Sequence, residues 1–286
     1  MKGIVLAGGT GSRLWPITKG VSKQLLPVYD KPLIHYPIGT LFLTGIRDIL
    51  IITTPDDLPS FQRLLGDGSQ YGASFTFETQ EKPNGIAEAF IIGEKFINGH
   101  SVVLILGDNI FHGVGLGEQL QSIDSSSGAT IFAYRVADPQ RYGIVEFSEN
   151  GKVISLEEKP IRPKSNFAVP GLYFYDKKVV EIAKDIEPSS RGELEITAIN
   201  NIYLRNKMLT TKILKRGTTW LDTGTIQTLQ AAAAYVQIIE ERQGYKISCL
   251  EEIAWRKGWI SDSDLDLLAK NYGSSPYSAY LKNFRL

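Results

Sequence analysis

A glycine-rich segment near the N-terminus has the residue types that bind phosphate. The segment LAGGTGSRL, residues 6–14, follows a short apolar run and carries Arg13. Its small residues are Gly8, Gly9, Gly11 and Ser12. Backbone amides of such a turn can approach an anion closely, and a basic side chain at its end adds charge. Lys23, ten residues after Arg13, could reach the same phosphates. The glycines alone fit an anion site and an empty turn equally well, and the two cations favour the anion site.

Two common nucleotide motifs do not fit this segment. A dinucleotide fingerprint requires GxGxxG, but Leu14 stands where the third glycine after Gly9 and Gly11 belongs. A P-loop requires lysine and a hydroxyl residue directly after the last glycine, whereas Ser12 and Arg13 follow Gly11. The segment therefore predicts neither of these motifs.

Two aspartates could hold a hard metal ion beside such phosphates. Asp108 follows the fully apolar run VVLIL, residues 102–106, and Asp222 lies in WLDTGT beyond another expected strand. The carboxyl edge of an open α/β sheet is the usual ligand site, and carboxylates with room for water suit Mg2+. An aspartate that only caps a turn is the simpler alternative for either residue taken alone. Asn109 is compatible with three roles: a contact to a sugar, a position in the shell of groups around the metal, or a residue of a turn.

Other polar residues are compatible with ligand contacts, although the residue types do not decide between roles. Gln80, in TQEKPNGIAEAF, offers the donor and acceptor that match the edge of thymine or uracil, but a solvated loop glutamine fits as well. Glu158 and Lys159 end an expected strand, so we expect their side chains to point to opposite faces, one toward sugar and one toward phosphate. An exposed ion pair is the alternative. Arg191, at the start of an expected helix, fits a phosphate contact or a solvated position.

Composition excludes several classes of function. The 286 residues carry 31 Lys and Arg against 31 Asp and Glu, so no global field attracts nucleic acid or an anionic membrane. The apolar run at 3–7 is too short for a signal peptide, and no later run approaches the roughly 20 residues of a spanning helix. We therefore expect a cytoplasmic protein. One cysteine, Cys249, and three histidines leave no internal disulfide and no soft-metal cluster.

The order of the apolar runs predicts an α/β fold. Strand-like runs alternate with helical spacing in the first hundred residues, which is typical of βαβ units in a parallel sheet. These strands are expected at 3–7, 48–53 and 101–106, and the helices at 32–44 and 59–65. Strands dominate after Asp124 and are expected at 129–136, 142–147, 152–158 and 168–175. Asn150 and Gly151 have the spacing of a two-residue hairpin turn.

Helices return toward the C-terminus. They are expected at 176–186, at 194–204, at 225–242 behind a Thr225 cap, and over the tail from Cys249. We therefore expect a Rossmann-like α/β fold with a mixed, mainly parallel central sheet flanked by helices and a helical C-terminal appendage. No repeat or proline-rich linker separates independent domains. The expected division is a core at 1–224, with halves at about 1–124 and 125–224, and a helical region at 225–286.

Long stretches of the sequence resemble the sugar nucleotidyltransferases, in particular the branch that transfers a thymidylyl group to glucose 1-phosphate. The resemblance begins with LAGGTGSRL and SKQLLPVYDKPLIHYPI. It continues through LGDNIFHG, YGIVEF, LEEKP, GLYFYD, RGELEIT and WLDTGT, over nearly the whole chain. It implies Mg2+-dependent attack of α-D-glucose 1-phosphate on the α-phosphorus of dTTP. The implied products are pyrophosphate and dTDP-glucose, a precursor of dTDP-L-rhamnose and related deoxysugars.

The resemblance also implies which residues bind each substrate. For the nucleotide it implies Gly8, Gly9, Gly11, Ser12, Arg13, Lys23, Gln24, Gln80, Gly85 and Asp108. For the sugar phosphate it implies Asn109, Gly143, Glu158, Lys159, Val169 and Arg191. Asp108 and Asp222 would bind the metal and, with Arg13 and Lys23, form the catalytic set. Residues 1–124 would then be the nucleotide half and 125–224 the sugar-binding half.

The resemblance further implies a homotetramer and a second, regulatory nucleotide site that involve the C-terminal helices. Candidates for that site are His112, Gly113, Arg216, Gly217, Cys249, Glu252 and Arg256, each of which also fits a surface or packing role. Three positions depart from the family. His112 stands where many relatives carry tyrosine, and Pro170 and Ala198 stand where threonine and aspartate are common. Pro170 removes a backbone donor and a hydroxyl beside the sugar site, which leaves the sugar preference open.

Two alternative functions remain open from the sequence. The first is the same chemistry with UTP or with another hexose 1-phosphate. The second is a non-catalytic subunit that senses nucleotide sugars, which is disfavoured because Arg13, Lys23, Asp108 and Asp222 are all present. Neither nucleic acid nor a membrane is an expected partner.

Overall fold

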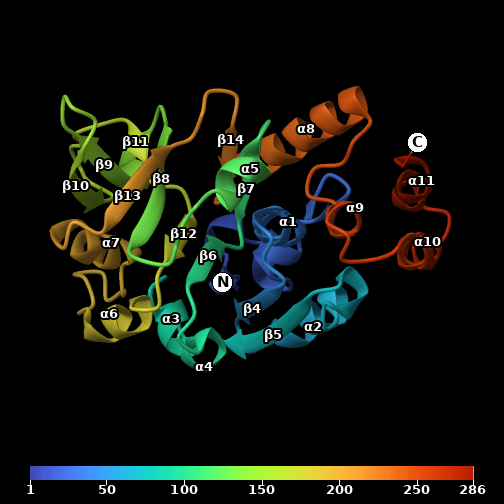
Figure 1. Cartoon of the computed structure of the whole chain (residues 1–286), viewed down its shortest axis with the longest axis horizontal. Coiled ribbons are helices and arrows are strands. Elements are labelled where there is room, and N and C mark those ends of the chain that lie inside the picture. The colour runs from blue at the N-terminus through green and yellow to red at the C-terminus, as the bar shows by residue number, and fades with distance from the viewer. Residues whose placement is uncertain (286) are drawn as a thin grey trace.

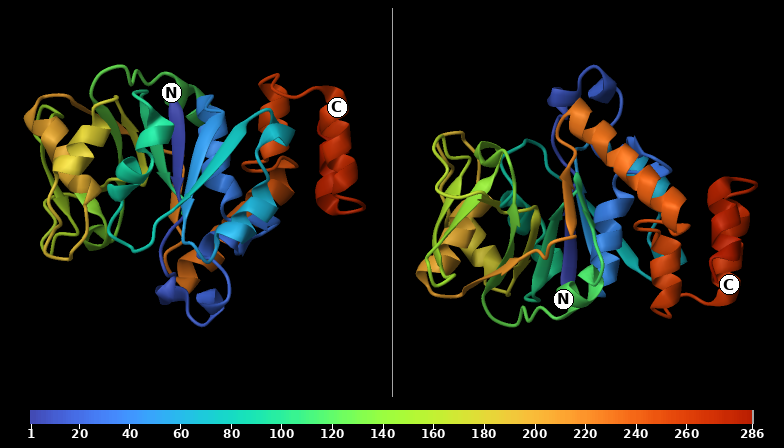
Figure 2. Two further views of the ribbon diagram at one scale, coloured as in Figure 1. Left: turned by 90° about the horizontal axis from the view of Figure 1, so that it is seen from below. Right: turned by 90° about the horizontal axis from the view of Figure 1, so that it is seen from above.

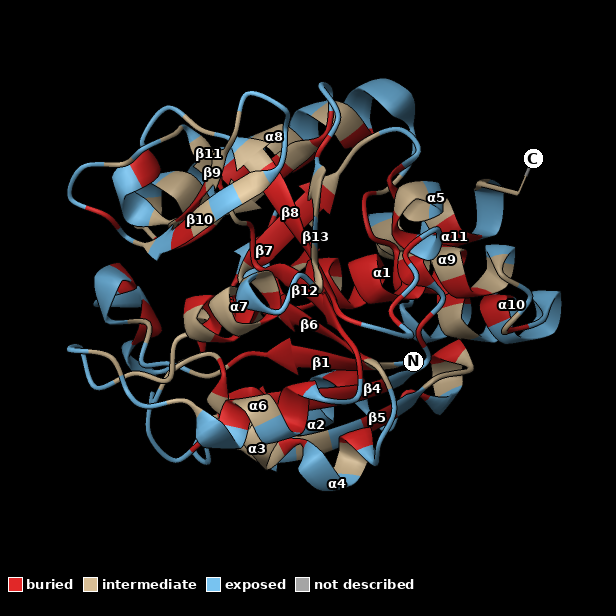
Figure 3. Ribbon diagram, turned by 60° about the vertical axis from the view of Figure 1, so that its left-hand side comes forward, coloured by how far each residue is buried: buried red, intermediate tan, exposed pale blue. Residues whose placement is uncertain are grey.

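Four parallel strands form one side of a ten-stranded sheet in the computed structural model, which describes residues 1–285 (Figure 1). They are β1 (Lys2–Leu6), β4 (Asp48–Thr53), β5 (Ser74–Thr79) and β6 (Val102–Leu106), in the order β5, β4, β1, β6. The four residues 102–105 are fully inaccessible to solvent, as expected for a strand covered on both faces. Figure 3 shows the central strands buried and the exposed residues on the surrounding helices and loops.

The other side of the sheet is mostly antiparallel. Its strands are β8 (Ala129–Arg135), β9 (Gly143–Phe147), β10 (Val153–Glu158), β11 (Phe167–Ala168), β12 (Leu172–Tyr175) and β13 (Leu209–Ile213). Strand β12 pairs with β6 and so joins the two sides, while β13 runs parallel to β8. The predicted α/β class with a mixed central sheet is therefore confirmed.

Two predicted details of this side were wrong. The strand expected at 168–175 is two short strands, β11 and β12, which are separated at Pro170 because proline has no N–H to donate to the ladder. The hairpin loop between β9 and β10 has three residues, 149–151, between Ser148 and Lys152, and not two. Ser148 N donates to Lys152 O at 2.8 Å across this turn. Gly151 has a φ of 72°, the left-handed position that a three-residue hairpin loop requires.

Helices cover both faces of the sheet. They are α1 (His35–Thr44), α2 (Leu58–Leu65), α3 (Glu88–Ile92), α4 (Glu94–Ile97), α5 (Leu116–Gln121), α6 (Val179–Asp185) and α7 (Ile196–Arg205). One buried core includes Phe42 of α1 and Phe61 of α2. The core on the opposite face includes Phe90 of α3 and Tyr203 of α7. The sheet is therefore the middle layer of three, which leaves its strand ends free to form a site.

Shorter elements connect these layers. The 3-10 helices are η1 (Ser12–Leu14), η2 (Ile17–Lys19), η3 (Lys23–Leu25), η4 (Ser69–Tyr71) and η5 (Pro139–Arg141). Two antiparallel pairs lie outside the main sheet: β2 (Pro27–Val28) with β3 (Lys31–Pro32), and β7 (Asn109–His112) with β14 (Thr219–Asp222). The second pair joins a segment near the end of the predicted half 1–124 to a segment at the end of the predicted half 125–224.

The C-terminal part of the chain is helical, as predicted. Its helices are α8 (Ile226–Gln243), α9 (Leu250–Arg256), α10 (Asp262–Asn271) and α11 (Pro276–Asn283). Helix α8 begins at the predicted cap, where Thr228 N donates to Thr225 Oγ1 at 3.2 Å. Helices α10 and α11 lie at the opposite end of the molecule from β9 and β10 (Figures 1 and 2). Within residues 1–285, no helix combines the length and apolar character needed to cross a bilayer.

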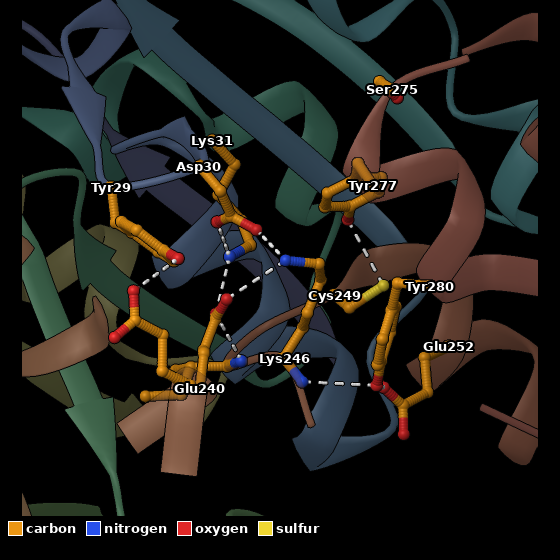
Figure 4. Close-up of polar contacts among 12 residues, drawn as sticks. Tyr29, Asp30, Lys31, Glu240, Lys246, Cys249, Glu252, Ser275, Tyr277 and Tyr280 are labelled. Carbon is orange, nitrogen blue, oxygen red and sulfur yellow. Dashed lines mark hydrogen bonds and ion pairs between the residues drawn. The ribbon is translucent and has the colours of Figure 1, made fainter. Parts of the chain in front are cut away.

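A buried ion cluster fastens α8 to the turn between β2 and β3 (Figure 4). Glu240 of α8 accepts hydrogen bonds from Lys31 Nζ at 3.0 Å and Lys246 Nζ at 3.1 Å. Asp30 pairs with the same two lysines. The side chains of Lys31 and Glu240 are each 4% exposed, so each charge depends on its partners. This turn follows η3, which carries Lys23, and the cluster therefore anchors the segment just beyond a candidate site residue.

Candidate active site

Two strands of the parallel group, β1 and β6, end at one cavity, and a third, β5, ends beside it. The glycine-rich segment follows β1, Gln80 follows β5, and Asp108 comes two residues after β6. The cavity has a volume of about 350 Å³. Its walls include Gly8, Gly9, Gly11, Ser12, Arg13, Lys23, Gln24, Asp108 and Asp222. These residues therefore meet at the carboxyl edge of the sheet, where open α/β folds bind ligands.

The glycine-rich segment requires glycine at two positions. Gly9 and Gly11 have φ angles of 106° and 59°, in the left-handed region that disfavours residues with a Cβ. Thr18 Oγ1 donates to Gly11 O at 2.7 Å and so closes the loop. Arg13 lies in η1 with an exposed side chain, and no carboxylate among residues 1–285 lies within ion-pair distance of it. Arg13 thus brings an unpaired positive charge to the cavity.

Lys23 directs its ammonium group at Asp108. The two side chains form an ion pair and are 13% and 21% exposed. Burial on its own would raise the pKa of Asp108, but Lys23 and a hydrogen bond from Asn109 hold that pKa below its ordinary value. The Asp108 carboxylate is therefore ionised at neutral pH. Gln24, next to Lys23, is buried and accepts a hydrogen bond from Ser22 Oγ at 2.8 Å.

Asp222 reaches the same place from β14. It lies opposite Asn109 in the antiparallel register of β14 and β7, and Thr223 Oγ1 donates to Asp108 O at 2.8 Å. Burial raises the pKa of Asp222, and the negative charge of Asp108 raises it further. Arg141 Nη2 lies 3.3 Å from Asp222 Oδ2 and partly offsets this effect. The two aspartates are therefore close enough to repel each other.

This pair of carboxylates fits a hard divalent cation. A cation beside both groups offsets their repulsion, and Mg2+ typically takes one or two carboxylates and completes its shell with water and substrate phosphate. Within the described residues, no group of three or more His, Cys, Asp and Glu side chains is placed to hold a metal. The donor set therefore suits a metal that is shared with a phosphate, and not a closed site made by protein alone.

Asn109 orients the Asp108 carboxylate from behind. Its Nδ2 donates to Asp108 Oδ1 at 2.7 Å. Its Oδ1 accepts from Trp220 Nε1 at 2.6 Å and from Gly171 N at 3.2 Å. Asn109 is only 3% exposed, so these partners fix its amide. Of the three roles open to Asn109, the geometry favours a place around the candidate metal site.

A second cavity, of about 230 Å³, opens beside the first. The two cavities share Arg13, Ile86, Leu106, Asp108 and Asp222. The second cavity is also lined by the candidates Asn109, Gly143, Glu158, Lys159 and Val169. The two carboxylates therefore stand where the predicted nucleotide site and the predicted sugar site meet.

The side chains of Glu158 and Lys159 do not point to opposite faces, so that expectation was wrong. Lys159 has a φ of 43° and leaves the extended conformation of β10. Both side chains consequently line the second cavity, with Lys159 Nζ 3.7 Å from Glu158 Oε1. The left-handed conformation costs a residue such as lysine ~1–2 kcal/mol and is often retained at functional sites.

Three candidates, Gln80, Gly85 and Arg191, lie beside the cavities rather than in their walls. Arg191 Nη2 bonds Glu195 Oε1 at 2.6 Å and lies 3.5 Å from Glu158 Oε1, so it stands near the edge of the second cavity. Gly85 has a φ of 113°, and a Cβ there would lie 2.4 Å from Leu194 O. Close packing against Leu194 therefore requires glycine at position 85 whether or not a base binds there.

Several residues in the second cavity were not predicted. Thr197 Oγ1 donates to Glu158 Oε2 at 2.5 Å, and Trp220 holds Asn109 as described above. Arg141, Tyr142 and Tyr173 also line this cavity. Arg141, Thr197 and Trp220 adjoin or lie within the family-like stretches YGIVEF, RGELEIT and WLDTGT. Their position in these stretches was the only available signal, because their partners are distant in sequence.

The candidates for a second nucleotide site fall into separate places in this chain. His112 and Gly113 line one cavity, of about 370 Å³, and Arg216 and Gly217 line another, of about 590 Å³. The pairing of β7 with β14 brings the two pairs close, since a Cβ on Gly113 would lie 3.4 Å from Gly217 O. His112 Nδ1 also lies 2.8 Å from the hydroxyl of Tyr235 on α8.

The remaining three candidates belong to α9 and its N-terminal cap. Glu252 accepts a hydrogen bond from Arg256 Nε at 2.7 Å. Cys249 is 1% exposed, and the Tyr277 hydroxyl donates to its sulfur at 3.2 Å. Within this chain Cys249 is therefore a packing residue.

The chain is similar to known nucleotide-transferring enzymes over almost its full length. Residues 2–238 match the family model described as nucleotidyl transferase. The chain is 56% identical to a glucose-1-phosphate thymidylyltransferase of Neisseria meningitidis serogroup A over 98% of each protein. It is also 56% identical to one of Mycobacterium tuberculosis, again over 98% of each.

Solved structures agree with this similarity. A Bacillus anthracis protein described as a glucose-1-phosphate thymidylyltransferase is 44% identical, with a TM-score of 0.76, and the match covers 82% of this chain and 94% of that one. A UDP-glucose pyrophosphorylase complexed with UDP-glucose shares the fold, with a TM-score of 0.72 at 24% identity over 83% of this chain and 98% of that one. From its sequence, its fold and the arrangement of its two cavities, the chain belongs to the nucleotidyl transferase family.

Proposed function

We propose that this nucleotidyltransferase transfers the thymidylyl group of dTTP to α-D-glucose 1-phosphate and releases pyrophosphate and dTDP-glucose. The observation that carries the proposal is the wall shared by the two cavities, which contains Arg13, Asp108 and Asp222. A reaction between two phosphate groups needs its charged residues at such a junction. The choice of substrates is supported by the relatives named for this activity, at 56% identity over 98% of the chain.

The reaction depends on alignment and charge neutralisation more than on proton transfer. A phosphate oxygen of glucose 1-phosphate attacks the α-phosphorus of dTTP, and the bond from that phosphorus to the bridging oxygen of pyrophosphate breaks. The attacking oxygen is already ionised, so no general base is required. The barrier comes from bringing two anions together in line, which positioned cations and amides lower.

The glycine-rich loop and its two cations would bind the triphosphate. The backbone amides of residues 8–12 can approach its oxygens, and Arg13 would stabilise the leaving pyrophosphate. Lys23 is paired with Asp108 in the free chain and would move its charge toward the α-phosphate when the nucleotide binds. Gln80 would contact the pyrimidine beside Gly85.

Asp108 and Asp222 would hold Mg2+ at the junction, with Asn109 orienting Asp108. When bound, Mg2+ neutralises charge on the triphosphate and assists the departure of pyrophosphate. The carboxylates of Asp108 and Asp222 suit this task because the described residues do not supply a complete set of metal ligands, which leaves coordination positions for phosphate and water.

The second cavity would bind the sugar phosphate. Glu158 would accept hydrogen bonds from glucose hydroxyls, with Thr197 fixing its orientation, while Gly143 and Val169 form the wall. Lys159 and Arg191 would neutralise the incoming phosphate.

We also propose that 1–124 is the nucleotide half and 125–224 the sugar half. The region 225–286 would form contacts between the subunits of a homotetramer. It would also contribute to a second nucleotide site, together with His112, Gly113 and Arg216.

A pyrophosphate-release assay tests the proposal. The nucleotides are dTTP and UTP, and the sugars are glucose 1-phosphate and other hexose 1-phosphates, each with and without Mg2+. The expected result is the highest kcat/KM for dTTP with glucose 1-phosphate, and only with Mg2+. Preference for UTP or another hexose would replace the proposed substrates. Nucleotide-sugar binding without turnover would favour a sensing subunit.

One variant separates catalysis from folding in the same assay. Asp108→Asn should lower kcat at least about a hundredfold, since a metal at a developing charge contributes several kcal/mol. The variant's Tm should stay close to that of the parent. Retained Mg2+-dependent activity in Asp108→Asn would remove Asp108 from the metal site.

A further inference from the structure

The side-chain amide of Gln80 is held from two directions. Its Nε2 donates to Glu88 Oε2 at 2.7 Å and to Gly85 O at 3.1 Å. Gln80 is 6% exposed, so water does little to satisfy the amide in another orientation. Both N–H groups of the amide are therefore committed to protein acceptors.

The chemistry of these two partners fixes which way the amide faces. A carboxylate and a backbone carbonyl accept hydrogen bonds and donate none. If the amide turned over, Oε1 would face both acceptors and two hydrogen bonds would be lost. The oxygen is instead on the side of Gly8, where a Cβ would lie only 2.9 Å from it. Gly8 lines the first cavity, so the absence of a side chain at position 8 leaves this acceptor accessible next to that cavity.

Glu88 is itself held in place for this contact. It is the first residue of α3, and its second oxygen accepts a hydrogen bond from Asn84 Nδ2 at 2.8 Å. The free N–H groups of the first turn favour a negative charge there. The carboxylate therefore remains an acceptor, and the Gln80 amide has one stable orientation.

We propose that Glu88 is a positioning residue for base selection: it locks the Gln80 amide so that an oxygen, and not an NH2 group, meets the pyrimidine. The proposal rests on the proposed function, in which Gln80 contacts the base. Thymine and uracil carry an N–H at ring position N3 and can donate to that oxygen. Cytosine carries an unprotonated N3, whose lone pair would face the oxygen. Glu88 would thus select nucleotides with an N3–H without touching them.

The test compares binding of dTTP, UTP and dCTP by isothermal titration calorimetry, which needs no turnover. In Glu88→Met the amide loses the stronger of its two anchors. The preference for dTTP over dCTP should then fall by about tenfold or more, while the ratio of dTTP to UTP stays unchanged because both bases carry N3–H. Glu88→Gln retains a carbonyl acceptor and should restore most of the discrimination. Glu94→Met, the same change at the first residue of α4, where the carboxylate pairs with Lys184 and not with Gln80, should change it little.

The outcomes separate this inference from the proposed function. Equal loss of affinity for dTTP and dCTP in Glu88→Met would give Glu88 only a structural role and would overturn the inference. Unchanged discrimination in that variant would overturn it as well. Absence of turnover of dTTP by the parent enzyme would instead contradict the proposed function, whatever the binding ratios. Thermal unfolding of each variant checks that it is folded at the temperature of the titration.

Discussion

Lys23 and Asp108, separated by 85 positions in the sequence, form an ion pair at the junction of the two cavities. The carboxylate of this pair is one of the two proposed to hold Mg2+. The ammonium group of Lys23 therefore repels a metal ion bound at Asp108. Lys23 and the metal ion nevertheless both attract the phosphates of the nucleotide. Removal of the lysine should therefore weaken the binding of the nucleotide and strengthen the binding of Mg2+ alone.

Replacement of Lys23 by methionine should separate these two effects. We expect Lys23→Met to bind dTTP about tenfold or more weakly, because a cation that contacts phosphate is lost. We expect the same variant to bind Mg2+ alone several-fold more tightly, because Asp108 is freed from its partner. Calorimetry of each ligand measures both changes, with Lys19→Met, an exposed lysine of η2, as the control. Weaker binding of Mg2+ alone by Lys23→Met would contradict the assigned relationship.

Trp220 should influence the rate although its ring nitrogen reaches the metal site only through Asn109. Trp220→Phe removes the donor to Asn109 Oδ1, so the Asp108 carboxylate loses part of its orientation. We expect kcat to fall about tenfold with little change in the KM for dTTP. The free energy of unfolding should fall by ~1–2 kcal/mol.

A second tryptophan provides the matched control for this experiment. Trp259 packs edge-on against Phe42, with ring centroids 5.1 Å apart. Trp259→Phe should lower stability and leave kcat unchanged. If the two variants lose activity only in proportion to their stability, Trp220 has no positioning role.

The hydroxyl of Thr197 should matter for the sugar and not for the nucleotide. Thr197→Val removes the hydrogen bond to Glu158 Oε2 while keeping the shape of the side chain. The KM for glucose 1-phosphate should rise about tenfold and the KM for dTTP should stay constant, since a hydrogen bond to a charged group contributes ~1.5–3 kcal/mol. Steady-state kinetics with each substrate varied gives both values, and Thr197→Ser should recover the parent behaviour. A parallel rise in both KM values would argue against a separate sugar site.

The ion cluster around Asp30 should make the stability of the protein depend on acid pH. Burial alone would raise the pKa of Asp30, but Lys31 and Lys246 hold it below its ordinary value. A carboxyl with a lowered pKa in the folded state adds stability above about pH 4, and this stability is lost as the pH falls through the folded-state pKa. Asp30→Asn should therefore be less stable by on the order of 3 kcal/mol at pH 7.

The pH dependence of this difference distinguishes a charge effect from a packing effect. The gap in unfolding free energy between the parent and Asp30→Asn should narrow as the pH falls below about 4, because Asp30 is then protonated in the unfolded chain and, only at lower pH, in the folded protein. Urea unfolding at several pH values measures the gap. A gap that is constant from pH 3 to pH 7 would show that the charge of Asp30 does not contribute.

The sequence was sufficient to predict the family and many of the elements, because both depend on contiguous residues, although elements such as β5 and β13 were not predicted. The apolar run at 102–106 predicted a buried strand, Thr225 predicted a helix start, and the glycine-rich segment with WLDTGT indicated the family. The placement of the glycine-rich segment and Asp108 on one edge of the sheet followed from the parallel arrangement of β1 and β6.

What could not be predicted depends on tertiary contacts or on a single backbone angle. Glu88 and Thr197 act through hydrogen bonds to side chains whose orientation is set by the fold, and nothing in their local sequence signals this. The expected alternation of Glu158 and Lys159 failed because one residue adopts a positive φ. Pro170 did interrupt a strand, as its missing N–H requires, but the apolar residues around it concealed the break.

The central claim, that the sugar phosphate attacks the α-phosphorus of dTTP at the junction of the two cavities, is tested most directly with isotopes. The enzyme is incubated with dTTP, Mg2+ and glucose 1-phosphate that carries 18O in its non-bridging phosphate oxygens. The masses of the products are then measured by mass spectrometry. The account predicts that all labelled oxygens appear in dTDP-glucose and none in pyrophosphate, and that Asp108→Asn forms neither product at a comparable rate. Label in pyrophosphate, or no labelled nucleotide sugar from a folded enzyme that binds both substrates, would contradict it.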